Sequence, residues 1–263
     1  MKIDVCVKQV PASNETRMDP VTHTIIRDGA GSVLNPFDAY AVEEALRLRE
    51  RTSGTVKAFS MGIPAAADML RRVLALGVDD ALLLTDRAFA GSDTLATARV
   101  LAVAIASDGM PDLILCGRMA TDGDTAQVGP MLAECLGIPH ISDVAAVEEI
   151  TEDAAVVRRL TDYGYVRLRV RLPALLTVLK EINNPRLPSL TGILRAEERE
   201  IPRADHETLG LNPALTGLGG SATRVVSSVR PVLEKKSEVL GGTPAQQAAV
   251  LLERLDATGL IPE

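Results

Sequence analysis

Aromatic residues are nearly absent from this chain: they make up 2% of its 263 residues, and tryptophan does not occur. The core of the protein must therefore be built from aliphatic side chains. Cysteines are also few, and Cys6, Cys116 and Cys135 lack the paired spacing of metal ligands. Their odd number and spacing argue against a disulfide framework or a zinc site and favour a reducing, cytoplasmic location.

A surplus of basic residues is missing as well. The net charge is −7, and the sequence pI is about 5.2, which argues against nucleic-acid binding because phosphate contacts need Lys and Arg. No stretch approaches the ~18 apolar residues of a membrane span. Residues 1–5 run into a strand pattern without the apolar core of a signal peptide. The expected partners are proteins and small molecules, without membrane insertion.

Familiar catalytic groupings are missing too. His23, His140 and His206 lie far apart, no serine stands in a nucleophile-elbow motif, and the chain has neither a Walker lysine loop nor a G-x-G-x-x-G motif. A protein without an evident acid, base or nucleophile is expected to rely on a bound cofactor for its chemistry.

What is present is an alternation of short apolar runs with longer helical patterns over the first two-thirds of the chain. This alternation predicts a doubly wound α/β fold with a mostly parallel sheet, in which ligands bind at the carboxyl ends of the strands. The predicted strands are residues 3–7, 56–60, 81–85 and 113–116, and the predicted helices are residues 38–49, 64–76 and 94–106.

Beyond about residue 145 the pattern becomes that of a β-hairpin extension, with strands at 156–160 and 165–172. Arg167, Arg169 and Arg171 alternate with apolar residues, so one face is basic. This face is either a solvated edge strand or a docking surface for an acidic partner.

The chain is rich in turn-forming residues from Asn183 onward, and such a stretch is expected to lie across another surface. We therefore expect residues 1–182 to form a nucleotide-binding domain and residues 183–263 to form a partner-binding loop and C-terminal arm. A short helix in the arm is predicted to have Thr243 as its N-cap, Pro244 at its first position and Gly259 as its stop.

The most informative loop is residues 116–130, which joins the apolar run 113–115 to a helical pattern. A glycine-containing loop between a strand and a helix presents backbone N–H groups that favour a phosphate. Asp124 is predicted to cap the helix, leaving the amides of Ala126, Gln127 and Val128 for the phosphate, while Asp122 turns toward a hydroxyl or a backbone donor. Mg²⁺ bridging is the less favoured alternative, so no metal site is predicted.

Further loops are expected at the same edge of the sheet. Residues 8–11 follow the first strand, and Asn35 or Asp38 either caps the next helix or contacts the ligand. Gly62 allows a ring or phosphate to approach the backbone. In residues 85–94, Ser92 or Asp93 is a predicted N-cap, and small residues including Gly91 leave room for a ligand.

Four segments carry a resemblance to a known family: residues 5–10, 35–45, 116–130 and the stretch from 172–178 to 184–186. Together they resemble the β subunit of electron-transfer flavoproteins over nearly the whole chain. The resemblance implies an adenine-nucleotide α-hydrolase-like fold and an αβ heterodimer whose α subunit holds an electron-transferring FAD.

In that family the β subunit binds AMP in a conventional branch, or a second FAD in a branch that bifurcates electrons from NADH. Residues 122–130 and 89–94 resemble the bifurcating branch, so FAD is the expected cofactor and AMP the alternative. The chain departs from that branch at Met119-Ala120-Thr121, where relatives commonly carry Gln-Ala-Ile.

The resemblance further implies that NADH gives hydride to the β-bound FAD. One electron then passes to ferredoxin or flavodoxin, and the other passes through the α-subunit FAD to an acyl-CoA dehydrogenase or quinone oxidoreductase.

Arg118 is the candidate for stabilising an anionic flavin, or it is a surface residue. Leu190 matches a leucine that anchors the dehydrogenase, or it belongs to the core. The cofactor-binding residues expected from the loops and the resemblance are Cys6, Val7, Lys8, Asn35, Pro36, Phe37, Asp38, Met61, Gly62, Gly91, Ser92, Asp93, Thr94, Gly117, Arg118, Met119, Ala120, Thr121, Asp122, Gly123, Asp124, Thr125, Ala126, Gln127 and Val128.

Overall fold

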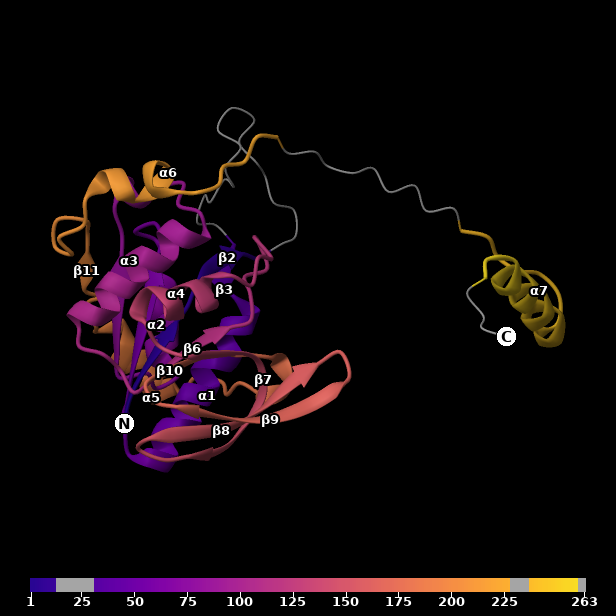
Figure 1. Cartoon of the computed structure of the whole chain (residues 1–263), viewed down its shortest axis with the longest axis horizontal. Helices are drawn as coiled ribbons and strands as arrows, with labels where there is room; N and C mark the ends of the chain where they lie inside the picture. Colours follow the sequence, from indigo (N-terminus) through magenta and orange to yellow (C-terminus); the bar gives the residue numbers. More distant parts are fainter. Residues whose placement is uncertain (13–30, 228–236, 260–263) are drawn as a thin grey trace. The chain divides into compact units, whose positions relative to one another are not determined.

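The computed structural model describes residues 1–12, 31–227 and 237–259 of the chain. These residues belong to two compact units, Met1–Val226 and Ser227–Glu263, which are described one at a time. Figure 1 shows the elements of both units.

The four predicted strands are present and parallel. They are β1 (Lys2–Cys6), β4 (Thr55–Met61), β5 (Asp80–Leu84) and β6 (Leu113–Gly117). Their apolar side chains are buried from both faces, as expected of parallel strands covered by helices. The doubly wound α/β prediction is therefore confirmed.

Among the described residues, further strands extend this sheet to nine, in the order β11-β5-β4-β1-β6-β10-β7-β8-β9, where β8 is Ala154–Thr161 and β9 is Gly164–Arg171. Strand β10 (Ala174–Val178) is wholly buried and lies parallel between β6 and β7 (His140–Ile150). Strand β11 (Arg203–Ala204) adds to the other end beside β5. A small second sheet pairs β2 (Gln9–Pro11) with β3 (Ser32–Leu34).

Helices cover both faces of the sheet. One face packs against α1 (Pro36–Thr52), α2 (Ala66–Ala75) and α5 (Leu190–Glu197), and the other against α3 (Thr94–Ser107) and α4 (Val128–Leu136), which lie side by side (Figure 1). Both core clusters are dominated by Val, Leu, Ile and Ala, as the scarcity of aromatics requires.

The predicted hairpin is formed by β8 (Ala154–Thr161) and β9 (Gly164–Arg171), which continue antiparallel from β7. Arg167, Arg169 and Arg171 are exposed, while Val170 between them is buried. Arg167 pairs with Glu148 and Glu149 of β7, so its charge is neutralised within the sheet.

The first unit ends at Val226, well beyond the predicted boundary after residue 182. Residues after Asn183 remain with it because they bond to its helices and strands. The Asn183 amide donates to the Tyr40 carbonyl and the Glu44 carboxylate, and Arg186 forms ion pairs with Glu43 and Glu50. The short helices of this stretch are η3 (Pro213–Leu215) and α6 (Gly217–Gly220), and η2 (Lys180–Ile182) comes before it. Helix α6 contacts η1 (Arg87–Phe89), which precedes α3.

The second unit contains helix α7 (Pro244–Ala257). Thr243 caps this helix in a capping box with Gln246, Pro244 occupies the first turn, and Gly259 follows in the left-handed region, as predicted. None of the residues of α7 is buried, and its side chains Val250, Leu251 and Leu252 are exposed. Among the described residues, no helix has the length and apolar character that crossing a membrane requires.

Candidate nucleotide site

The predicted site residues meet where the winding of the sheet changes direction. From β1 the chain proceeds to β4 and β5 on one side and then returns to β6 on the other. Cys6 and Cys116 are partners in the β1–β6 register, so the loops that follow them begin side by side. Such a switch point, at the carboxyl ends of the strands, is where open α/β sheets bind ligands.

Asn35 joins two of these loops. It is 1% exposed, its side-chain nitrogen donates to the Met119 carbonyl at 2.9 Å, and its side-chain oxygen accepts from the Thr121 amide at 3.2 Å. Although Asn35 is the N-cap residue of α1, its side chain makes no capping bond. Its role is to fix the backbone of residues 119–121, a role that neither the capping nor the ligand-contact hypothesis anticipated.

Asp38 fixes the same region from the first turn of α1. Its carboxylate accepts hydrogen bonds from the Lys8 amide at 2.7 Å and from the Gly117 amide. Burial raises the pKa of Asp38 to about 7, against the effect of these bonds and of the Asn35 amide. A side chain at Gly117 would collide with Asp38 and the Phe37 backbone, so only glycine allows this approach.

Lys8 and Asp122 form an ion pair, with Lys8 Nζ 2.6 Å from Asp122 Oδ1. The Asp122 side chain is 2% exposed, whereas that of Lys8 is 37% exposed. The negative charge of Asp122 is therefore compensated beside the predicted phosphate position, which relieves the repulsion that an isolated carboxylate there would cause.

The start of α4 differs from the prediction. Asp124 is not the helix cap: the N-cap residue is Gln127, which makes no side-chain capping bond. Asp124 and Ala126 both adopt positive φ, 51° and 53°, which turns the chain before the helix begins. The first-turn amides are consequently those of Val128 and Gly129, and residues 123–127 are exposed. An uncapped helix start next to an exposed loop is suited to bind an anion.

The start of α3, in contrast to that of α4, has a side-chain cap. Of the two predicted caps, Ser92 and Asp93, it is Asp93 that caps this helix, with its carboxylate accepting from the Ala96 amide at 2.9 Å. Thr94 bonds to Gln127 at 3.1 Å, which connects this loop to the start of α4. The expectation that Gly91 leaves room for a ligand is wrong at the position where a side chain of residue 91 would stand, because the Leu218 side chain occupies that position.

The remaining predicted residues lie at the same edge of the sheet or just beyond it. Met61 ends β4, and Gly62 after it donates its amide to the Leu84 carbonyl. Arg118 is held by Asp143, with Arg118 Nε 3.1 Å from Asp143 Oδ1, a partner that the sequence did not suggest. Gly123 has open space where a side chain would stand. Leu190 opens α5 and is 73% exposed, so it does not belong to the core.

The histidines are not gathered into a site within the described part of the chain. His206 lies 2.5 Å from Asp86, and this hydrogen bond raises the pKa of His206. His140 is exposed at the start of β7, and His23 lies outside the described residues.

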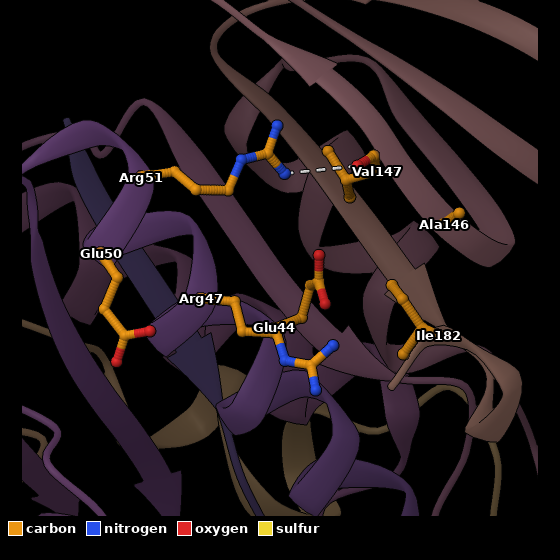
Figure 2. Close-up of a pocket in the computed structure, with 7 residues that line it drawn as sticks. All are labelled: Glu44, Arg47, Glu50, Arg51, Ala146, Val147 and Ile182. Atoms are coloured by element: carbon orange, nitrogen blue, oxygen red, sulfur yellow. Dashed lines mark hydrogen bonds between the residues drawn. The ribbon is translucent and has the colours of Figure 1, made fainter. Parts of the chain in front are cut away.

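One cavity lies elsewhere, between α1, β7 and η2 (Figure 2). It has a volume of about 470 Å³ and none of the predicted site residues lines it. Figure 2 shows Arg51 reaching across it to the Val147 carbonyl. Its lining consists of Glu44, Arg47, Glu50, Arg51, Ala146, Val147 and Ile182.

The sheet switch point, the close approach at Gly117 and the uncapped α4 are features that nucleotide-binding α/β proteins share. The family model for the electron transfer flavoprotein domain matches residues 22–209 of the chain. The chain therefore belongs to the electron transfer flavoprotein family.

Curated relatives match over nearly their full length. An electron transfer flavoprotein subunit beta of Thermoanaerobacterium thermosaccharolyticum is 46% identical over 99% of this chain and 100% of its own. The caffeyl-CoA reductase-Etf complex subunit CarD of Acetobacterium woodii is 45% identical over 95% of both chains. The acryloyl-CoA reductase electron transfer subunit gamma of Anaerotignum propionicum is 37% identical over 97% of this chain and 98% of its own. The chain is thus an electron transfer flavoprotein chain of the β-subunit type, as its sequence motifs predicted.

Proposed function

We propose that this chain, paired with an electron transfer flavoprotein α subunit, binds FAD at the carboxyl edge of its sheet and passes electrons from NADH to downstream acceptors. The observation that carries the proposal is the pairing of an uncapped α4 with a loop that Asn35, Asp38 and Lys8 hold in place. Two of its relatives are named as subunits of acyl-CoA reductase systems, which supports an electron-transferring role.

The residues present fit a dinucleotide. The amides of Val128 and Gly129 and the positive end of the α4 dipole favour a phosphate group. Gly123 leaves space on the exposed side of the loop, and Gly117 brings the loop close to α1. Bound FAD would supply the two-electron and one-electron redox chemistry that no side chain of this site provides.

The protein's own part is to hold the loop and set its charge. Asn35 fixes the carbonyl of Met119 and the amide of Thr121 through backbone atoms. The departures from the family pattern at these two positions therefore change side chains without removing those bonds. The Arg118 side chain is 46% exposed and forms an ion pair with Asp143. It can therefore still reach a negative group, but its attraction for that group is weakened by Asp143 and by solvent.

Two surfaces of the described residues fit protein partners. On α5, Leu190 and Leu194 are exposed, as is Leu187, which precedes the helix in sequence. These apolar side chains suit a dehydrogenase or quinone oxidoreductase. On α7, the exposed Leu251 and Leu252 suit the α subunit. Ferredoxin or flavodoxin would take the other electron, as in the bifurcating branch that the sequence resembles.

A second candidate is the conventional arrangement, in which AMP occupies the β subunit and the only redox flavin lies in the α subunit. The same helix start and loop would hold the single phosphate of AMP. The features that favour FAD are the sequence of residues 122–130 and the open space beside Gly123.

The test is an anaerobic titration of the purified αβ heterodimer with NADH, followed by flavin absorbance. Bleaching by stoichiometric NADH is the expected result, and reduction by dithionite in a parallel cuvette shows that the flavin is competent. A heterodimer that dithionite bleaches and NADH does not would exclude the NADH-oxidising proposal.

A further inference from the structure

A stretch near the end of the first unit lies against the loop that precedes α3. Residues 216–223, which we call the clasp, contain α6 and lie beyond the residues that the family model matches. Thr216 is 2% exposed, and its hydroxyl donates to the Ala88 carbonyl at 3.0 Å. Gly217 has positive φ and lies so close to the carbonyls of Ala88 and Ala90 that a side chain would collide with them. The clasp is therefore fitted to this loop.

The clasp holds Asp93 from two residues. The Asp93 amide donates to the Ser221 hydroxyl at 2.8 Å. Thr223 donates to Asp93 Oδ2 with both its amide, at 2.8 Å, and its hydroxyl, at 3.0 Å. The other carboxylate oxygen, Oδ1, accepts from the Ala96 amide at the start of α3. One aspartate thus connects the clasp to the helix start.

The connection continues to the nucleotide loop. Thr94, the residue after Asp93, bonds through its hydroxyl to the Gln127 side chain at 3.1 Å. Gln127 is the N-cap residue of α4, whose first-turn amides form the phosphate position. A change at Thr223 therefore reaches that position through three consecutive contacts: Thr223 with Asp93, Asp93 with its neighbour Thr94, and Thr94 with Gln127.

We propose that Ser221 and Thr223 are positioning residues for the nucleotide, because they fix the segment 91–94 that supports the start of α4. This inference rests on the proposed nucleotide function. It adds residues from the end of the first unit to a site otherwise built from residues 6–129, and it makes nucleotide affinity depend on the clasp.

The test compares Thr223→Val with Thr223→Ser in the αβ heterodimer. Valine matches threonine in shape but lacks the hydroxyl, whereas serine keeps it. Thr208→Val is the matched control, because Thr208 makes the same amide and hydroxyl bonds to an aspartate, Asp205, outside the clasp. Affinity for FAD and for AMP is measured after removal of the bound nucleotide, together with hydrogen exchange of residues 91–96.

The expected result for Thr223→Val is an affinity about fivefold to tenfold weaker, since a hydrogen bond to a charged group contributes about 1 kcal/mol or more. Exchange of residues 91–96 should be faster, while Thr223→Ser and Thr208→Val bind as the wild type does. Unchanged affinity in Thr223→Val, with or without faster exchange, overturns the inference and leaves the proposed function intact. A wild-type heterodimer that takes up neither nucleotide overturns both.

Discussion

The carboxyl edge of the sheet and the cavity between α1, β7 and η2, which we call the groove, show two different uses of polar and charged residues. The groove has a volume of about 470 Å³, and four of its lining residues are charged. Those side chains all belong to α1, and their hydrogen bonds go to residues other than one another. Arg47 donates to Glu43, Glu50 accepts from Arg186, and Arg51 donates to the Val147 carbonyl. At the carboxyl edge, Asn35 and Asp38 are short, buried and bonded to backbone atoms of two loops.

Under the proposed function, the difference teaches that the volume of a cavity does not locate the binding site in this fold. A binding site needs groups that are already held in place, because ordering them at the moment of binding costs free energy. Ordering a long arginine side chain costs more rotamer entropy than ordering a short one, whereas the short side chains of Asn35 and Asp38 are already bonded to backbone atoms. Variants at the two regions should therefore differ in their effect on nucleotide binding.

The largest expected effect is that of Gly117→Ala. Its methyl group would collide with the Asp38 carboxylate and the Phe37 backbone, which forces α1 and the nucleotide loop apart. Nucleotide affinity should fall at least about 100-fold, and the free energy of unfolding by ~2 kcal/mol. Gly123→Ala is the matched control, since nothing lies within 4 Å of its added methyl. Equal nucleotide affinity in the two variants would refute the packing argument.

The next effect is a dependence of stability on pH that Asp38 produces. Its pKa is raised from 3.8 to about 7 by burial, so the folded state binds a proton more tightly than the unfolded state. The stabilisation is complete below about pH 3.8 and is lost as the pH rises through 7. Asp38→Asn lacks this group, so its stability relative to wild type should rise by up to ~4 kcal/mol between pH 4 and 8.

Denaturant unfolding at several pH values measures this difference. Asp4 supplies a comparison, because it is buried in β1 and its pKa is also raised to about 7, chiefly by burial. Asp4→Asn should show the same trend in stability without a change in nucleotide affinity, since Asp4 lies in the middle of the strand. If the difference in the free energy of unfolding between Asp38→Asn and wild type did not change across this pH range, the raised pKa of Asp38 would be contradicted.

Asn35→Ala should have a smaller effect. It leaves the Met119 carbonyl and the Thr121 amide without their partner, at a cost of about 1–3 kcal/mol in stability. Nucleotide affinity should weaken about tenfold, because residues 119–121 are no longer fixed. Asn212→Ala, which removes an exposed turn bond, is the control, and isothermal titration with FAD compares them. An affinity loss of the same size in both would show that Asn35 does not position the loop.

The smallest expected effect comes from the groove. Arg51→Ala removes a long bond of 3.4 Å to the Val147 carbonyl. Stability should change by no more than about 0.5 kcal/mol, and nucleotide affinity should not change. A marked loss of nucleotide affinity would assign the groove to the site and remove the contrast between the two regions.

The parallel strands, and the edge of the sheet at which the loops of the candidate site gather, could be predicted from the sequence, because apolar runs followed by polar loops mark the ends of buried strands. Thr243 was predictable as a cap, and Asp93 as one of two candidate caps, because short polar side chains just before a helix accept hydrogen bonds from its first-turn amides. The start of α4 was not, since nothing in the residue types Asp124 and Ala126 signals two left-handed residues. The partners of residues 91–93 lie about 130 positions away, and a local pattern carries no information on such contacts.

Strand β10 was recognised only as part of a family motif, although it is a short apolar run. Its preceding residues, Leu172 and Pro173, joined it to the hairpin in the sequence pattern. Turn-forming residues after Asn183 suggested an arm, but a local pattern could not show that Arg186 pairs with α1 and that β11 joins the sheet.

The most direct test of the central claim is the nucleotide content of the heterodimer, released by denaturation and separated by chromatography. The wild type should release two FAD and no AMP per heterodimer, and Gly117→Ala should release one FAD. One FAD with one AMP from the wild type would contradict the FAD assignment. Two FAD from Gly117→Ala would contradict the placement of the nucleotide at the carboxyl edge of the sheet.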